Sequence, residues 1–157
     1  MNPVEHLVAH AGSWRGTSTL QDPHTGKPDG SPSTLTVTPV FGGRFVRLDY
    51  TWSHQGNPQE GSLLIGFDPN TRTISGHWID TWHMAHAAMI CLGPEPTSGT
   101  LKLAGTYAAP PGPDWGWRIE ITAAAGVEAL RITMTNVWPE ATREETAVEA
   151  VYTRVST

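Results

Sequence analysis

The sequence predicts an all-β protein: a single antiparallel up-and-down β-barrel of about ten strands, preceded by a short N-terminal helix. Three observations support this prediction. Short segments rich in Val, Ile, Thr and Trp alternate between apolar and polar residues, as strands with one buried face do. Turn residues interrupt these segments at intervals of about 8 to 16 residues. After the first residues, no long segment has the apolar spacing of a helix.

The elements follow in order along the chain. Asn2 suits the N-cap of a helix of one or two turns, Pro3 its first position and Gly12 its stop. The expected strands are 13–21, 33–40, 44–54, 60–67, 73–81, 86–92, 99–107, 116–123, 128–137 and 145–155. Short connections imply antiparallel neighbours, and a sheet of this many strands curls and closes. Residues 1–157 are therefore expected to form one domain.

The connections between the expected strands differ in length. Most of those after even-numbered strands are tight, and "FGGRF" is expected to be a two-residue Gly-Gly hairpin. Those after odd-numbered strands are longer or irregular, including "SHQGNPQE" and "DTWHMAH". Alternate connections lie at the same end of an up-and-down barrel. We therefore expect a closed end with tight turns and an open end with longer loops.

The seven tryptophans are divided unevenly between these two ends. Trp14 begins the first strand, at the closed end, and the other six fall at the open end. Alternation along the strands also places most of these six side chains inside the barrel, where they would line a pocket for a small apolar or aromatic molecule. The candidate ligand-binding residues are Trp52, Trp78, Asp80, Trp82, Trp117, Met134, Asn136 and Trp138. The alternative is that these tryptophans only fill the barrel.

The segment "HWIDTWHMAH" carries most of the polar chemistry. It allows a second function, a small-barrel enzyme of the isomerase or cyclase type, with Asp80 as general base. Its apolar surroundings would raise the pKa of Asp80, and His83 or His86 would be its partner. A metal site would use these three residues and His77, but alternation turns His77 and Asp80 to opposite faces. No established ligand spacing is matched, so no metal site is predicted.

Composition and charge exclude several classes of partner. The formal charge is −5 and the ten lysines and arginines are scattered, which argues against nucleic acid and anionic membranes. The N-terminus "MNPVEHLVAH" lacks the apolar run of a signal peptide or membrane anchor. The single cysteine, Cys91, lies in an apolar run and is expected to be a core thiol in a reducing, cytoplasmic setting. The sequence allows either a monomer or a homodimer.

Charged residues gather on the strand faces opposite the apolar sets. Arg47, Arg118 and Arg131 are expected to form cross-strand ion pairs on the outer face of the barrel, with Asp49 and Glu120 among their partners. Exposed pairs of this kind contribute little to stability. They imply no function.

Gly12-Ser13-Trp14 at the first strand, together with "VYTRV" on the last, resembles the calycin superfamily of lipocalins and fatty-acid-binding proteins. The resemblance implies that Trp14 packs across the barrel floor beneath the guanidinium of Arg154, as a structural pair. The series "GSWRG", "FGGRFVRLDY", "LIGFDPNTRTISGHWID" and "YTR" is similar to an uncharacterised bacterial calycin-like family of unknown function. This similarity covers most of the chain.

Nitrobindins, which are haem-binding calycins, are similar to this sequence in their opening and barrel plan. That resemblance makes haem an alternative ligand, held by a histidine of a late strand. No histidine follows His86 in this sequence. No cofactor is therefore predicted.

Overall fold

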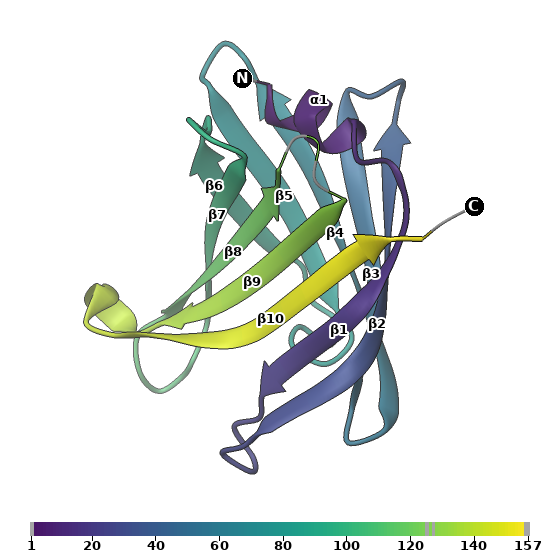
Figure 1. Cartoon of the computed structure of the whole chain (residues 1–157). Helices are drawn as coiled ribbons and strands as arrows, with labels where there is room; N and C mark the ends of the chain where they lie inside the picture. Colours follow the sequence, from purple (N-terminus) through teal and green to yellow (C-terminus); the bar gives the residue numbers. More distant parts are fainter. Residues whose placement is uncertain (1, 125, 127, 156–157) are drawn as a thin grey trace.

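The structure is a computed structural model that describes residues 2–124, 126 and 128–155. These residues form one α-helix, a short 3-10 helix and ten β-strands in a closed barrel (Figure 1). The helices are α1 (Pro3–Val8) and η1 (Pro139–Ala141). The strands are β1 (Gly12–Gln21), β2 (Pro28–Val40), β3 (Phe45–His54), β4 (Asn57–Asp68), β5 (Thr73–Asp80), β6 (Met89–Pro94), β7 (Thr100–Tyr107), β8 (Trp115–Ala123), β9 (Ala129–Val137) and β10 (Glu144–Arg154).

Each strand pairs antiparallel with its neighbours in the sequence, and β1 pairs with β10 to close the barrel. The all-β, up-and-down architecture is therefore confirmed. Some strand boundaries differ from those expected: β2 begins at Pro28 rather than at residue 33, and β6 at Met89 rather than at residue 86. The first part of β2 pairs with β1 only, because its register with β3 begins at Leu35. Pro32 is tolerated there because a proline without an N–H fits an edge position.

The N-terminal helix begins as expected, but it ends earlier. The side chain of Asn2 accepts hydrogen bonds from the backbone N–H groups of Val4 and Glu5, which makes it the N-cap. The expected stop at Gly12 is wrong, because α1 ends at Val8 and Ala9 is its C-cap. Gly12 instead opens β1 with a φ of +127°, a conformation that side-chain-bearing residues rarely adopt.

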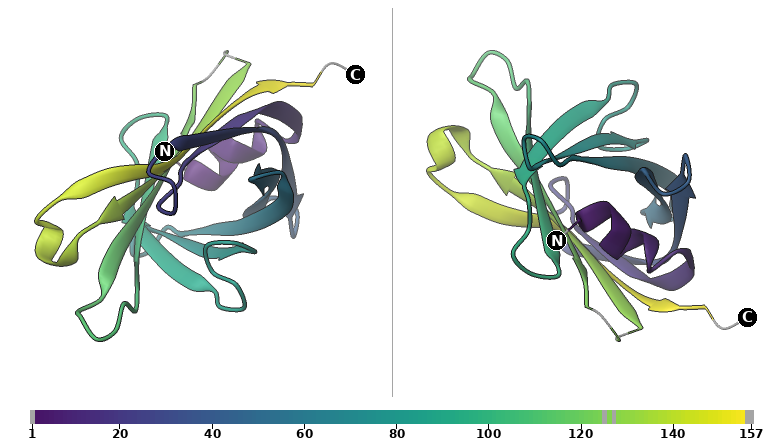
Figure 2. Two further views of the ribbon diagram at one scale, coloured as in Figure 1. Left: turned by 90° about the horizontal axis from the view of Figure 1, so that it is seen from below. Right: turned by 90° about the horizontal axis from the view of Figure 1, so that it is seen from above.

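The helix α1 lies across the closed end of the barrel, at the top of Figure 1 and in front in the right panel of Figure 2. Leu7 of α1 is fully buried. Trp14 is 1% exposed, and its indole N–H donates to the His10 carbonyl over 3.0 Å. The Arg154 guanidinium carbon lies 4.5 Å from the Trp14 ring centroid, and Nη1 donates to the Ala11 carbonyl over 2.9 Å. The two residues are also register partners across β1 and β10.

The interior alternates as the sequence predicts. On β3, for example, Val46 and Leu48 are fully buried, whereas Arg47 between them is exposed. Cys91 also lies in the core, and burial raises the pKa of its thiol to about 11. The expected ion pairs lie on the outer face, but only some of them cross between strands. Arg131 on β9 pairs with Glu149 on β10 at 2.7 Å, and Arg118 on β8 with Glu144 on β10 at 2.9 Å. Arg47–Asp49 at 2.8 Å and Arg118–Glu120 at 3.1 Å each lie within one strand.

The connections differ from expectation at two places. The connection between β3 and β4 is not long, because Gln55 and Gly56 alone form a tight turn, with φ of +49° and +82°. "FGGRF" is not a two-residue hairpin, because Val40 pairs with Phe45 and leaves the four residues 41–44 in the loop. The other four connections at the open end, 22–27, 81–88, 108–114 and 138–143, are longer.

Within the described residues, no helix has both the length and the apolar character needed to cross a membrane.

Candidate functional site

The open end of the barrel holds a pocket of about 530 Å³. It lies between the 81–88 connection and the facing ends of β7 and β8. Its walls are mainly aromatic and apolar: Trp78, Trp82, Met84, Ala87, Ala88, Met89, Tyr107, Ala108 and Trp117, with His83, Thr106 and Asn136 as polar members. A second pocket of about 220 Å³ shares Trp82, His83, Trp117 and Asn136 and extends towards β1 and β10.

Four tryptophans form the centre of this end. Trp78 on β5 and Trp117 on β8 both point inward and stack with ring centroids 5.3 Å apart and an angle of 11°. Trp82, just after β5, is half-buried and meets Trp52 edge to face at 5.8 Å. Such aromatic pairs stabilise the arrangement beyond the area that they bury. Alternate residues of a strand share a face, and Trp52, Trp78 and Trp117 all occupy positions whose side chains point into the barrel.

Beneath the pocket, Asp80 is the centre of a hydrogen-bonded group. Its Oδ2 accepts from the Tyr50 hydroxyl over 2.7 Å and from Trp52 Nε1 over 3.3 Å. The Tyr50 oxygen in turn accepts from Trp78 Nε1 over 2.9 Å. We call Tyr50, Trp52, Trp78 and Asp80 the polar layer. All four are buried, and each indole N–H of the layer has a partner.

Gly61 makes this layer possible. Tyr50 on β3, Gly61 on β4 and Asp80 on β5 are register partners in one row across the sheet. A Cβ at Gly61 would lie 2.2 Å from the Tyr50 hydroxyl oxygen. Only a residue without a side chain therefore lets the tyrosine ring pass over β4 and reach Asp80.

The other oxygen of Asp80 organises the start of the 81–88 connection. Oδ1 accepts from the backbone N–H groups of Trp82 over 2.9 Å and His83 over 2.8 Å, and from His83 Nδ1 over 3.1 Å. The carboxylate therefore receives five donors in all. This turn places His83 over Asp80. The sequence suggests His83 as a partner of Asp80.

The pKa of Asp80 corrects the expectation from the sequence. Burial by itself raises this pKa, but hydrogen bonds and charge from His83, together with the Tyr50 hydroxyl, outweigh it and hold the pKa below its ordinary value. The expected rise is therefore wrong. A carboxylate that is held ionised and fully hydrogen-bonded is a poor general base. Burial and the neighbouring Asp80 raise the pKa of Tyr50 well above its ordinary value, so its hydroxyl stays a donor.

His83 sits among tryptophan rings. Its ring centroid lies 4.7 Å from that of Trp82, 5.4 Å from Trp117, 5.5 Å from Trp52 and 5.7 Å from Trp78. The ionised Asp80 can only accept, so Nδ1 carries the proton and Nε2 of a neutral ring is an acceptor. This Nε2 atom is buried and has no hydrogen-bond partner.

Two further polar residues lie at the pocket. The Tyr107 hydroxyl donates to Asn136 Oδ1 over 2.6 Å, and the Tyr107 ring meets Trp117 edge to face at 6.4 Å. Trp117 Nε1, like His83 Nε2, is buried without a hydrogen-bond partner.

The remaining candidates from the sequence lie apart from the larger pocket. Met134 is buried below it and lines a separate cavity of about 10 Å³. Trp138 packs on Trp115 with ring centroids 4.6 Å apart, lies under the Arg143 guanidinium and lines neither open-end pocket. His86 and His77 are exposed. The four residues of the metal alternative therefore do not converge.

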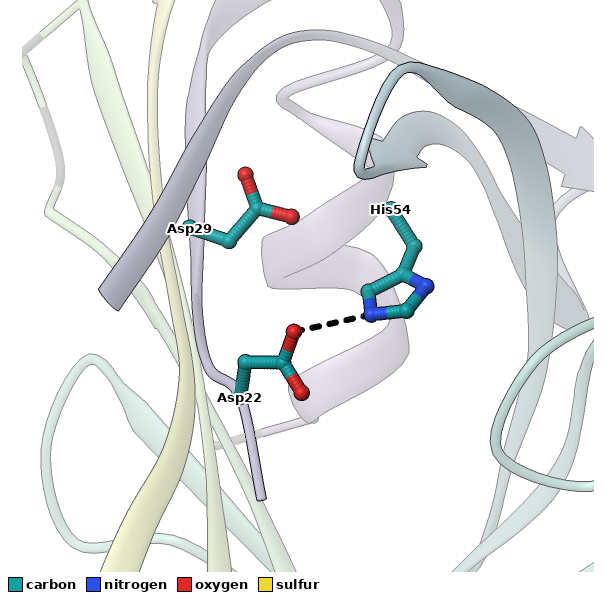
Figure 3. A group of neighbouring side chains, drawn as sticks. All are labelled: Asp22, Asp29 and His54. Carbon is teal, nitrogen blue, oxygen red and sulfur yellow. Dashed lines mark hydrogen bonds and ion pairs between the residues drawn. The ribbon is translucent and has the colours of Figure 1, made fainter. Parts of the chain in front are cut away.

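A different group brings potential metal ligands together. Asp22, Asp29 and His54, from β2 and the open ends of β1 and β3, each offer one ligand atom, and these atoms lie within 4.8 Å of one another (Figure 3). His54 Nε2 lies 2.9 Å from Asp22 Oδ2. Burial raises the pKa of Asp22, but hydrogen bonds from the His24 backbone and from the His54 and Gln55 side chains bring it below its ordinary value. Two carboxylates and an imidazole could hold a divalent cation, although these hydrogen bonds already satisfy Asp22.

Haem does not fit the residues at the open end. His83 is the histidine that lines both pockets, but four tryptophan rings surround its imidazole. An iron atom must approach a ring nitrogen directly, with a porphyrin plane around it. The four tryptophan rings occupy the space that such a plane would need.

Sequence reasoning did not identify two residues of the site. Alternation along β3 turns Tyr50 into the barrel, but its bond to Asp80, two strands away, depends on Gly61 of the strand between them. A glycine within an alternating strand, opposite a large aromatic residue, was the available signal. Tyr107 gave no local signal, because its partner Asn136 is 29 residues away.

The model of a family described as "Protein of unknown function (DUF1579)" matches residues 2–154. This match spans almost the whole chain, so the chain belongs to that family. A comparison with curated proteins finds no match. The closed antiparallel barrel fits a calycin-like fold.

Proposed function

We propose that this member of the DUF1579 family binds a small apolar or aromatic molecule at the open end of its barrel. One observation carries the proposal: the pocket of about 530 Å³ whose walls are mainly tryptophan, methionine, tyrosine and alanine side chains. Pockets for small molecules commonly have volumes of roughly 300–1,000 Å³ and combine apolar walls with a few polar groups. His83 and Asn136 supply such polar groups here.

The arrangement of the barrel also supports this location. Below the polar layer the buried side chains are mainly aliphatic, with Trp14 at the floor, and the cavity beside the layer measures only about 10 Å³, room for no more than one water molecule. The space above the layer is therefore the better place for a ligand. Filling the barrel explains the buried Trp78, but not the half-buried Trp82 beside an open pocket.

Tryptophan fluorescence tests the proposal directly, because the walls are themselves the fluorophores. We expect the neutral probe N-phenyl-1-naphthylamine to bind with quenching of tryptophan emission. Trp82→Ala, which removes one wall, should weaken its binding about tenfold. Trp115→Ala is the matched control, because Trp115 packs on Trp138 away from both pockets. Equal affinity of wild type and Trp82→Ala, or no binding to either, would contradict the proposal.

A second candidate is an enzyme that moves a proton, with His83 rather than Asp80 as the base. The specific observation is the bond between His83 Nδ1 and Asp80, which leaves Nε2 as a buried acceptor at the pocket. Asp80 then acts as a positioning residue that fixes the ring and its tautomer. This reassigns the role that the sequence gave to Asp80.

Hydrogen–deuterium exchange separates the two candidates. The enolisable ketone 2-tetralone would exchange its α-protons in D₂O faster with the wild type than with His83→Gln if His83 is a base. The same variant should bind 2-tetralone within a few fold of the wild type. Equal exchange rates with both proteins, at the rate without protein, would eliminate the enzyme and leave the binding protein.

A further inference from the structure

Two buried nitrogen atoms at the pocket have no hydrogen-bond partner: His83 Nε2 and Trp117 Nε1. Among the described residues the third atom of this kind is Nε of Arg118, which lies on the outer face 3.1 Å from Glu120. The first two belong to rings that line both open-end pockets. Buried polar groups are nearly always paired, and an unpaired one is costly, so this concentration at one place points to a bound partner.

The two atoms require opposite hydrogen-bonding partners. Trp117 Nε1 carries a hydrogen and can only donate. His83 donates through Nδ1 to Asp80, and in the uncharged form of the imidazole Nε2 can then only accept. A complementary ligand group must therefore accept one hydrogen bond and donate another within a small space.

The two rings are direct neighbours. The centroids of the His83 and Trp117 rings lie 5.4 Å apart. A small polar group of one ligand is therefore the simplest partner for both nitrogens, and a hydroxyl is the smallest group that both accepts and donates.

We propose that the ligand carries a hydroxyl on an aromatic or otherwise apolar body, accepting from Trp117 Nε1–H and donating to His83 Nε2. This inference rests on the proposed function and names the class of its ligand. A carbonyl or ether leaves Nε2 of the uncharged His83 ring unpaired, because it has no hydrogen to donate. An ammonium leaves Trp117 unpaired, and a carboxylate brings a second negative charge close to Asp80, which receives its hydrogen bonds from His83.

Entry of the hydroxyl requires a small movement of the side chains at the mouth. Both nitrogens are covered, and the half-buried ring of Trp82 lies 4.7 Å from the His83 ring. Trp82 belongs to the 81–88 connection rather than to a strand, so a movement of its ring leaves the pairing of the strands unchanged. A hydroxyl needs much less space than the porphyrin excluded above.

Three naphthalene derivatives of similar shape distinguish the contributions of the two hydrogen bonds. 2-Naphthol can donate and accept, 2-methoxynaphthalene can only accept, and 2-methylnaphthalene can do neither. By isothermal titration calorimetry we expect 2-naphthol to bind about tenfold more tightly than 2-methoxynaphthalene, or about 1.4 kcal/mol. We expect 2-methoxynaphthalene in turn to bind several-fold more tightly than 2-methylnaphthalene.

Two variants assign each preference to its residue. His83→Phe should remove the preference for 2-naphthol over 2-methoxynaphthalene, and Trp117→Phe should remove that for 2-methoxynaphthalene over 2-methylnaphthalene. Both keep an aromatic ring in place. Trp115→Phe is the control and should keep both preferences, because its ring lies away from the pockets.

Indole N–H signals in ¹⁵N NMR spectra give a readout that does not depend on the variants. 2-Naphthol should move the Trp117 signal downfield, and 2-methylnaphthalene should not, while the Trp115 signal stays in place with both. Binding of all three compounds with equal affinity would overturn this inference and leave the proposed function intact. Binding of none of them would refute both.

Discussion

Replacing Gly61 with alanine tests whether the polar layer holds the open end together. The new methyl group would lie 2.2 Å from the Tyr50 hydroxyl oxygen and 2.3 Å from its Cζ. Non-bonded carbon atoms are most stable at about 3.5–4.0 Å, so the ring must move by roughly 1 Å or more. The movement breaks the bonds of Tyr50 with Asp80 and Trp78, which measure 2.7 and 2.9 Å.

Two contributions set the expected magnitude. Overpacking of a core costs about 1–3 kcal/mol, and a buried polar group that loses its partner costs about 1–3 kcal/mol. Because the ring relieves part of the clash as it moves, we expect a total loss of about 2–5 kcal/mol. In a chain of this size that lowers the melting temperature by roughly 5–15 °C.

Urea unfolding followed by circular dichroism measures the change. Gly30→Ala is the matched control, because its Cβ would meet only Thr19 Oγ1, at 3.9 Å. It should stay within about 0.5 kcal/mol of the wild type. If Gly61→Ala proves as stable as Gly30→Ala, the role given to the glycine and to the Tyr50–Asp80 bond is refuted.

Three further predictions concern other parts of the barrel. Arg154→Ala should lower the free energy of unfolding by about 1–3 kcal/mol, because it removes the cation–π contact with Trp14 and the bond to Ala11; an unchanged urea midpoint would contradict this. Cys91, whose pKa burial raises to about 11, should resist Ellman's reagent at about pH 8 and react only after denaturation in guanidinium chloride; rapid reaction of the native protein would be inconsistent with its place in the core. The pKa of Asp80 is lowered in the folded state, so its contribution is present above the ordinary value of about 3.9 and is lost as pH falls through the folded pKa. The wild type should therefore lose stability between about pH 5 and pH 3 more steeply than Asp80→Asn, and equal slopes of unfolding free energy against pH would refute this.

The sequence predicts the barrel and its inward faces well, because the signals for both are local. Val46, Leu48, Tyr50 and Trp52 alternate along one strand, and all four are buried. Alternation does not predict the orientation of side chains after the end of a strand, however. Trp138 follows the end of β9, and its ring turns onto Trp115 instead of towards the pocket.

The chemistry of Asp80 was harder to predict because it depends on contacts between strands. Its apolar surroundings are visible in the sequence and suggest a raised pKa. The hydrogen bonds from the Tyr50 hydroxyl, on another strand, and from the turn at His83 cannot be seen in the sequence. They lower the pKa of Asp80 instead of raising it. The direction of a pKa shift follows the number of donors around a buried carboxylate as much as its burial.

The polar layer also bears on how fast a ligand would come and go. Barrels that enclose their ligands deep in the interior release them only when strands or lids separate. Here Tyr50 and Asp80 close off the interior beneath the pocket, and the walls above belong partly to the 81–88 connection. A molecule lodged there would exchange through the movement of one connection while the hydrogen bonds between strands stay intact. The ligand proposed above is therefore expected to exchange quickly.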